Sequence, residues 1–111
     1  MKRKDTKIYS QLVSKYCDAR WMVEYHEREI SKKLLLLGKA KNRYDEIDTS
    51  PILDDEVKEW YNGYTSMINL SIGLMKNNLK YDKEKMEKNG SILANEYEED
   101  LDLLYSQNKS Y

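Results

Sequence analysis

Cysteine, proline and glycine are all scarce in this sequence of 111 residues, and each shortage excludes a class of structure. Cys17 is the single cysteine, so neither an intramolecular disulfide nor a multi-cysteine zinc site can form. One proline and four glycines are too few for the many turns of a β-sandwich. Because 35% of the residues are charged, the composition favours long charged helices, and we expect an all-α fold.

Long apolar runs are missing as well. No stretch approaches the roughly 20 apolar residues that a membrane-spanning helix needs. The basic N-terminus, MKRKDTKIYSQ, is not followed by the apolar segment of a signal peptide. We therefore expect a soluble, cytoplasmic protein without membrane contact, and a lone cysteine suits that reducing compartment.

Motifs that carry catalysis or bind cofactors are also absent. The sequence has neither a glycine-rich phosphate loop nor a Gly-x-Ser-x-Gly elbow. Its single histidine, His26, lies in YHERE, which is not the HExxH spacing of zinc proteases, and the acidic stretch 45–56 lacks the spacing of a calcium loop. We expect no enzyme, no cofactor and no metal, and keep a metal or enzyme site around His26 as the last alternative.

A heptad pattern runs through the first 47 residues. Apolar or aromatic side chains recur at alternating steps of three and four, which is typical of a helix that lies along a partner. Asp5 or Thr6 can cap its start, so the pattern predicts a helix over residues 6–47. The positions are Tyr9, Leu12, Tyr16, Ala19, Val23, His26, Ile30, Lys33, Leu37, Ala40, Tyr44 and Ile47.

Two breaks divide the rest of the chain. Ser50 and Pro51 are typical of a helix cap and a first helical residue, which predicts a second helix over residues 51–88. The sequence Asn-Gly-Ser at 89–91 predicts a further break, followed by a short third helix over residues 92–107. We expect a single domain, 1–111, built as a long antiparallel helical hairpin with a short C-terminal helix.

The predicted second helix has two apolar stripes, whereas a helix that packs against a single partner needs only one. We assign Val57, Trp60 and Met67 to the hairpin and leave Tyr61, Ile68 and Ile72 uncovered. A bare apolar patch usually marks an interface, so we predict a homodimer in which two hairpins form a coiled-coil-like bundle. The predicted dimer interface is Leu35, Leu36, Tyr61, Ile68 and Ile72.

Charge is distributed in blocks. Residues 1–43 carry twelve Lys or Arg against five acids, whereas residues 44–75 carry one Lys against seven acids. Acidic and aromatic side chains together suit a partner protein with a basic surface. The predicted function is a non-enzymatic protein-interaction module, a small regulator or inhibitor of the phage or mobile-element type. Its predicted partner-binding residues are Asp54, Asp55, Glu56, Glu59 and Tyr61.

The alternative function is a nucleic-acid-associated regulator. A basic N-terminal arm and a row of lysines on the second helix can both neutralise phosphates. The sequence pI of about 5.9 and the absence of a helix-turn-helix pattern argue against it. The candidate contacts are Lys2, Arg3, Lys4 and Lys7 in the arm, with Lys76, Lys80 and Lys83 in the row.

Overall fold

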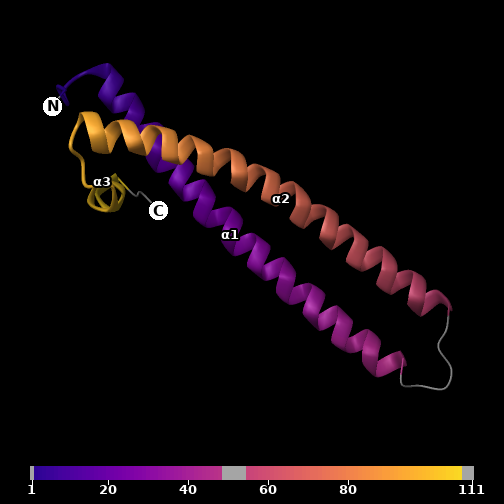
Figure 1. The fold of residues 1–111 in the computed structure, drawn as a ribbon. Coiled ribbons are helices and arrows are strands. Elements are labelled where there is room, and N and C mark those ends of the chain that lie inside the picture. The colour runs from indigo at the N-terminus through magenta and orange to yellow at the C-terminus, as the bar shows by residue number, and fades with distance from the viewer. Residues whose placement is uncertain (1, 49–54, 109–111) are drawn as a thin grey trace. The chain divides into compact units, whose positions relative to one another are not determined.

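The computed structural model describes residues 2–48 and 55–108, and its described part is all-helical. Helix α1 spans Lys7–Asp48, α2 spans Asp55–Glu96 and α3 spans Leu101–Asn108. The two long helices pack as a hairpin, and the short α3 follows them (Figure 1). The predicted all-α hairpin with a short third helix is therefore confirmed. No helix among the described residues is long and apolar enough to cross a membrane.

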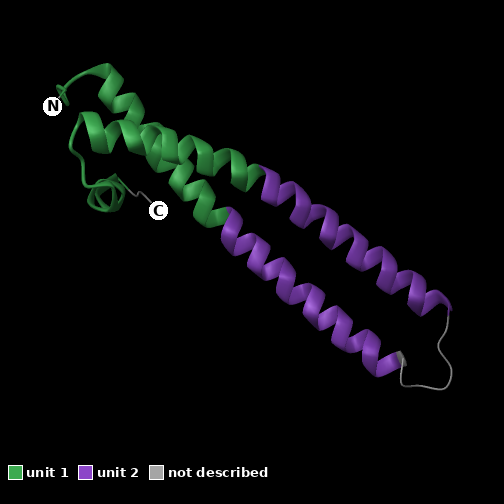
Figure 2. Ribbon diagram, viewed as in Figure 1, with its two compact units in different colours: residues 1–25, 78–111 green, residues 26–77 purple. Residues whose placement is uncertain are grey.

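The chain divides into two compact units, coloured separately in Figure 2. Unit 1 combines residues 1–25 with 78–111, and unit 2 comprises residues 26–77. Each unit contains a segment of α1 and a segment of α2, and unit 1 also contains α3. The single-domain assignment stays a prediction, and the two units are described separately below.

Helix α1 follows the heptad that the sequence predicted. Thr6 caps it, because its side-chain oxygen accepts a hydrogen bond from the backbone N–H of Tyr9 at 3.1 Å. The helix ends within one residue of its predicted end. Half of the twelve heptad residues are buried, namely Tyr16, Ala19, Val23, His26, Ile30 and Ala40.

Helix α2 does not end where the sequence predicted. It continues through Asn89, Gly90 and Ser91 to Glu96, so the predicted break at 89–91 is wrong and α3 begins at Leu101 instead of residue 92. The Asn89 side chain donates to the Lys85 carbonyl at 2.8 Å and so bonds within the helix. The predicted start at Pro51 lies outside the described residues, and the described helix begins at Asp55.

The actual end of α2 lies just beyond Glu96. Glu98 adopts a φ of 54°, the left-handed conformation that commonly terminates helices. The N–H of Glu99 then turns back to donate to the Leu93 carbonyl at 3.1 Å. A glutamate gives little sequence signal for this turn because the position usually favours glycine.

Gly90 is required by close packing inside unit 1. A Cβ at this position would lie 2.9 Å from Cε1 of Tyr16 and 3.3 Å from Cδ1 of Leu101. Tyr16 is buried, so its ring has little room to move. The glycine that suggested a helix break therefore allows α1 to approach α2.

Replacing Gly90 with alanine is expected to destabilise the protein by about 1 kcal/mol. Alanine favours a helix by up to ~1 kcal/mol over glycine, but overpacking a core typically costs about 1–3 kcal/mol. Gly38→Ala is the matched control, since a Cβ there meets nothing within 4 Å and is expected to stabilise the protein. Urea denaturation of both variants checks the prediction, and stabilisation by Gly90→Ala would contradict it.

The core of unit 1 joins all three helices. Its buried side chains come from α1, from the end of α2, from Tyr97 just beyond α2 and from α3, and Leu93 is completely buried. Asp100 caps α3, because its carboxylate accepts a hydrogen bond from the Leu103 N–H at 3.2 Å. The cluster consists of Tyr16, Cys17, Leu93, Tyr97, Leu104 and Tyr105.

Arg20 holds α3 against α1 in the same unit. Its guanidinium lies 4.4 Å from the centre of the Tyr105 ring and pairs with Asp102 at 2.9 Å. The same group donates to the Tyr16 hydroxyl at 2.9 Å. On the other edge, the Tyr105 hydroxyl donates to Glu24 at 3.0 Å. This network fixes the position of an eight-residue helix that would not be stable alone.

Unit 1 is expected to lose stability above pH 10. Burial and a hydrogen bond to a carboxylate raise the pKa of Tyr105 from 10.0 to about 12. The same two causes raise the pKa of Tyr9 from 10.0 to about 12. A raised pKa means that the folded state holds the phenol proton more tightly, so the contribution of these two hydroxyls to stability is constant below pH 10 and is lost between pH 10 and about 12.

Denaturation midpoints measured across this range, together with tyrosinate absorbance, check the prediction. The variant Tyr9→Phe/Tyr105→Phe provides the control, because it lacks both hydroxyls and should lose less stability over the same interval. An equal fall in the native protein and this variant would assign the effect to other groups, such as lysines.

Candidate functional site

The acidic residues predicted to bind a partner lie at the start of α2 in unit 2. Asp55, Glu56 and Glu59 are all exposed. Negative charge in the first turn of a helix is stabilised by the helix dipole, which explains why acids are tolerated close together there. Asp54 lies outside the described residues.

Tyr61 does not belong to this exposed group. Its ring stacks on that of Tyr44 with centroids 4.1 Å apart, and its side chain is half-buried between α1 and α2. Trp60, its neighbour in sequence, is instead 46% exposed and stacks on Tyr64 at 5.7 Å. We define the acidic patch by Asp55, Glu56, Glu59 and Trp60.

Three of the five predicted dimer residues are covered within one chain. Ile68 and Ile72 are buried and Tyr61 is half-buried, so the expectation that they form a bare surface is wrong. They face α1 as part of the seam, meaning the contact line between the two long helices. Leu35 and Leu36 are exposed, as predicted.

A different row of apolar side chains on α2 is exposed. Met67 is 74% exposed, Leu70 68% and Leu74 59%, and all lie in unit 2. With Trp60 and Gly63 they follow steps of three, four, three and four residues. We call these five residues the outer stripe. The sequence-based prediction had assigned Trp60 and Met67 to the seam, and their exposure corrects that assignment.

Sequence periodicity contained a signal for the correct seam. Seven-residue steps from Ile72 reach Leu79, Met86 and Leu93, which are all apolar, whereas seven-residue steps from Leu74 reach Tyr81 and then a lysine. The row that stays apolar along the whole helix is the seam. Following each row beyond the most apolar stretch would have identified it.

A groove lies beside the seam in unit 2. Its volume is about 550 Å³, and both long helices contribute to its walls. Trp60 and Leu36 provide its apolar side chains, while Lys39 and Arg43 bring positive charge. The full lining is Leu36, Lys39, Ala40, Asn42, Arg43, Trp60 and Tyr64. The groove therefore adjoins the acidic patch through Trp60.

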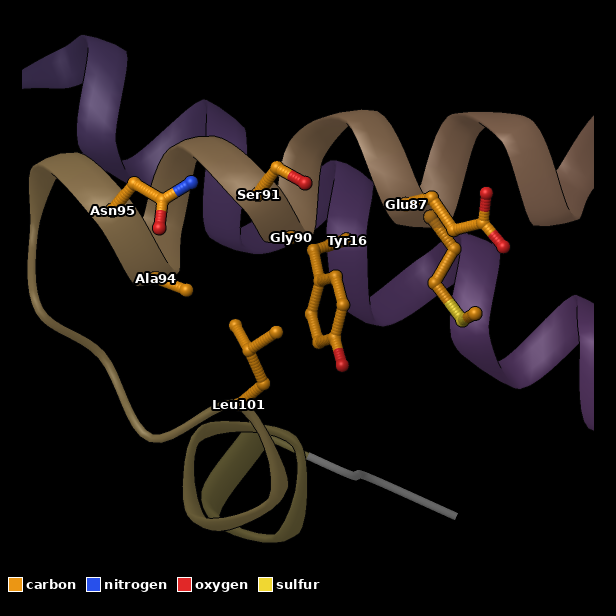
Figure 3. Close-up of a pocket in the computed structure, with 8 residues that line it drawn as sticks. Tyr16, Glu87, Gly90, Ser91, Ala94, Asn95 and Leu101 are labelled. Carbon is orange, nitrogen blue, oxygen red and sulfur yellow. The ribbon is translucent and has the colours of Figure 1, made fainter.

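Unit 1 contains a smaller depression, shown in Figure 3. It measures about 310 Å³ and lies where Tyr16, Gly90 and Leu101 approach one another. Figure 3 shows the ring of Tyr16 and the side chain of Leu101 beside the α2 backbone, with Ser91 and Asn95 on the helix. Its lining includes no histidine or cysteine, and we assign no ligand to it.

The predicted N-terminal basic residues are engaged in ion pairs. Three of the four side chains contact carboxylates within unit 1. One of these carboxylates is that of Glu99, whose pKa is lowered mainly by a hydrogen bond from Lys4. Lys7, the fourth, is exposed at the start of α1. The pairs are Lys2 with Glu96 at 2.6 Å, Arg3 with Asp5 at 2.6 Å and Lys4 with Glu99 at 2.8 Å.

His26 and Cys17 are both buried in packed surroundings. His26 occupies a heptad position of α1, and within residues 2–48 and 55–108 no three metal-ligating side chains are grouped closely enough to hold an ion. Cys17 borders a depression of about 460 Å³, but burial raises the pKa of its thiol. A raised pKa suppresses the reactive thiolate form.

Comparisons with protein-family models, with curated proteins and with solved structures found no significant match to this chain. The functional proposals below therefore depend on the geometry of its own residues.

Proposed function

We propose that this protein is a non-enzymatic protein-interaction module, a small regulator or inhibitor, that binds a partner protein with a basic surface through the acidic patch. The observation that carries the proposal is the exposure of Trp60 beside Asp55, Glu56 and Glu59. A cytoplasmic location is part of the proposal.

Trp60 supplies the apolar centre that such a contact needs. Tryptophan is among the residues most enriched at interaction hot spots because it buries a large area with few rotatable bonds. Stacking on Tyr64 already restrains the ring, which lowers the entropy lost when a partner covers it. The groove that includes Leu36 gives a partner side chain a place to insert next to this ring.

The carboxylates supply the charge complementarity. Exposed acids at the rim of an interface accelerate association with a basic surface and make binding sensitive to salt. The same acids repel phosphates, which argues against nucleic acid as the partner of this patch. In the N-terminal arm, ion pairs within unit 1 compete with phosphate for Lys2, Arg3 and Lys4.

The test is capture of a partner by the immobilised native chain at low salt, followed by elution with increasing salt. The variant Asp55→Lys/Glu56→Lys/Glu59→Lys is expected to lose the partner. The matched control is Glu84→Lys/Glu87→Lys/Glu98→Lys, which reverses three exposed acids of unit 1 and should retain it. Equal capture by both variants would reject the acidic patch.

Trp60→Ala tests the aromatic contribution separately. Hot-spot tryptophans typically cost more than about 2 kcal/mol when truncated, so affinity should fall at least ~30-fold. Tyr81→Ala is the control, because Tyr81 is 66% exposed and lies in unit 1. Titration calorimetry measures the affinity of both variants for the captured partner. An unchanged affinity of Trp60→Ala would show that the aromatic ring is not part of the interface.

A further inference from the structure

The outer stripe of α2 shares Trp60 with the acidic patch, but its other large side chains, Met67, Leu70 and Leu74, are explained neither by packing within unit 2 nor by that patch. Met67, Leu70 and Leu74 are each more than half exposed and lie on one face of one helix. A contiguous row of large apolar side chains in water usually marks an interface. Its steps of three and four are those of a helix that packs along another helix.

Gly63 leaves open space on this face of α2. Glycine inside a helix is less favourable than alanine. A Cβ at Gly63 would meet no described atom within 4 Å, as at Gly38 and Gly73, so packing among the described residues does not require a glycine there. In Gly90, by contrast, the missing side chain makes room for Tyr16. A space at Gly63 suits a side chain that comes from outside the chain.

We propose that the outer stripe binds the outer stripe of a second copy of this chain, with the two α2 helices antiparallel. Trp60 and Leu74 are each seven residues from Met67. In an antiparallel pair centred on Met67, Trp60 of one copy meets Leu74 of the other. Gly63 then lies near Leu70 of the other copy, so the open space at the glycine faces a large side chain.

Charge selects the antiparallel orientation. Around the start of the stripe, Asp55, Glu56 and Glu59 outnumber a single lysine, Lys58, whereas Lys76 lies just beyond its end. Antiparallel pairing brings the acids of each copy towards Lys76 of the other, and parallel pairing would bring the acids together. Like charges placed side by side disfavour association, so the parallel arrangement is rejected.

Molar mass in solution tests the self-association. Light scattering at about 100 µM should give twice the chain mass of 13.3 kDa for the native protein, because a dimer with a Kd well below that concentration is then fully formed. Met67→Glu/Leu70→Glu should give the mass of one chain with an unchanged helical signal. Leu35→Glu is the control, because Leu35 is 60% exposed on α1 and should leave the dimer intact.

A native mass of one chain at this concentration would overturn the proposal, and so would a dimer that survives Met67→Glu/Leu70→Glu. These substitutions leave Asp55, Glu56 and Glu59 unchanged, so failure of self-association and failure of the partner-binding proposal are distinguishable.

Orientation is tested by disulfide cross-linking in a Cys17→Ala background, where no other cysteine remains. An antiparallel pair places Met67 next to its own counterpart, so Met67→Cys should cross-link on mild oxidation. Leu74→Cys should not, because its counterpart lies at the other end of the stripe. Cross-linking of both variants would support a parallel pair and overturn the antiparallel one.

Discussion

Replacing Leu93 with alanine should remove about 3–5 kcal/mol from the free energy of unfolding. Leu93 has no exposed surface and lies in the cluster that joins α1, α2 and α3 in unit 1. Leucine-to-alanine changes in packed cores typically cost 2–5 kcal/mol, and the cost is highest where neighbours cannot relax into the cavity. The buried rings of Tyr16 and Tyr105 are held by hydrogen bonds, and that of Tyr97 packs at a tilt against Tyr9, so we expect little relaxation.

Leu103→Ala provides a matched control in the same unit. The residue type and the substitution are the same, but Leu103 is 55% exposed on α3, so its loss should cost less than about 1 kcal/mol. Urea denaturation followed by circular dichroism compares the two variants. Since small domains are stable by only about 5–15 kcal/mol, this loss should lower the denaturation midpoint of Leu93→Ala well below that of the native chain. Similar midpoints for both variants would place Leu93 outside the core.

Helix α1 could be predicted from sequence because a single heptad pattern determines both its extent and its buried face. Its apolar positions follow a single heptad, and a threonine cap precedes the first of them. Period and cap are local properties, so they determine the helix and its buried face without knowledge of the partner helix. The burial of Tyr16, Val23 and Ile30 follows directly from that pattern.

The end of α2 could not be predicted in the same way. Asn-Gly-Ser at 89–91 resembles a turn locally, but Gly90 lies in a helix because Tyr16 of α1 occupies the space beside it. That contact joins residues 74 positions apart in sequence. Tertiary packing overrides local propensity here, whereas the real turn uses a glutamate, Glu98, that carries no typical turn signal.

The acidic residues of the candidate site could be predicted from sequence, but its exposed aromatic residue, Trp60, could not. Exposed acids at the start of a helix follow from sequence, because charge is rarely buried. Trp60 and Tyr61, however, are adjacent and point about 100° apart, so choosing the wrong apolar stripe exchanges one for the other. The same error moved Ile68 and Ile72 from the seam to a predicted surface.

The second large effect is expected from Ile68→Glu, which should unfold the hairpin of unit 2. Ile68 is only 8% exposed between α1 and α2, so the new carboxylate would lose most of its contact with water. Lost apolar burial and desolvation of a charge together should cost more than about 3 kcal/mol. Thermal melting followed by circular dichroism should show a broad loss of helical signal at temperatures where the native chain is folded.

Met67→Glu is the control for this prediction, since it places the same carboxylate one residue away on the same helix. Met67 is 74% exposed, so its replacement should change the unfolding free energy of a single chain by less than about 0.5 kcal/mol. Equal melting of the two variants would contradict the assignment of Ile68 to the seam. Because Ile68→Glu acts on the fold of each chain, its effect on molar mass says nothing specific about association. Only substitutions on the outer stripe separate folding from pairing.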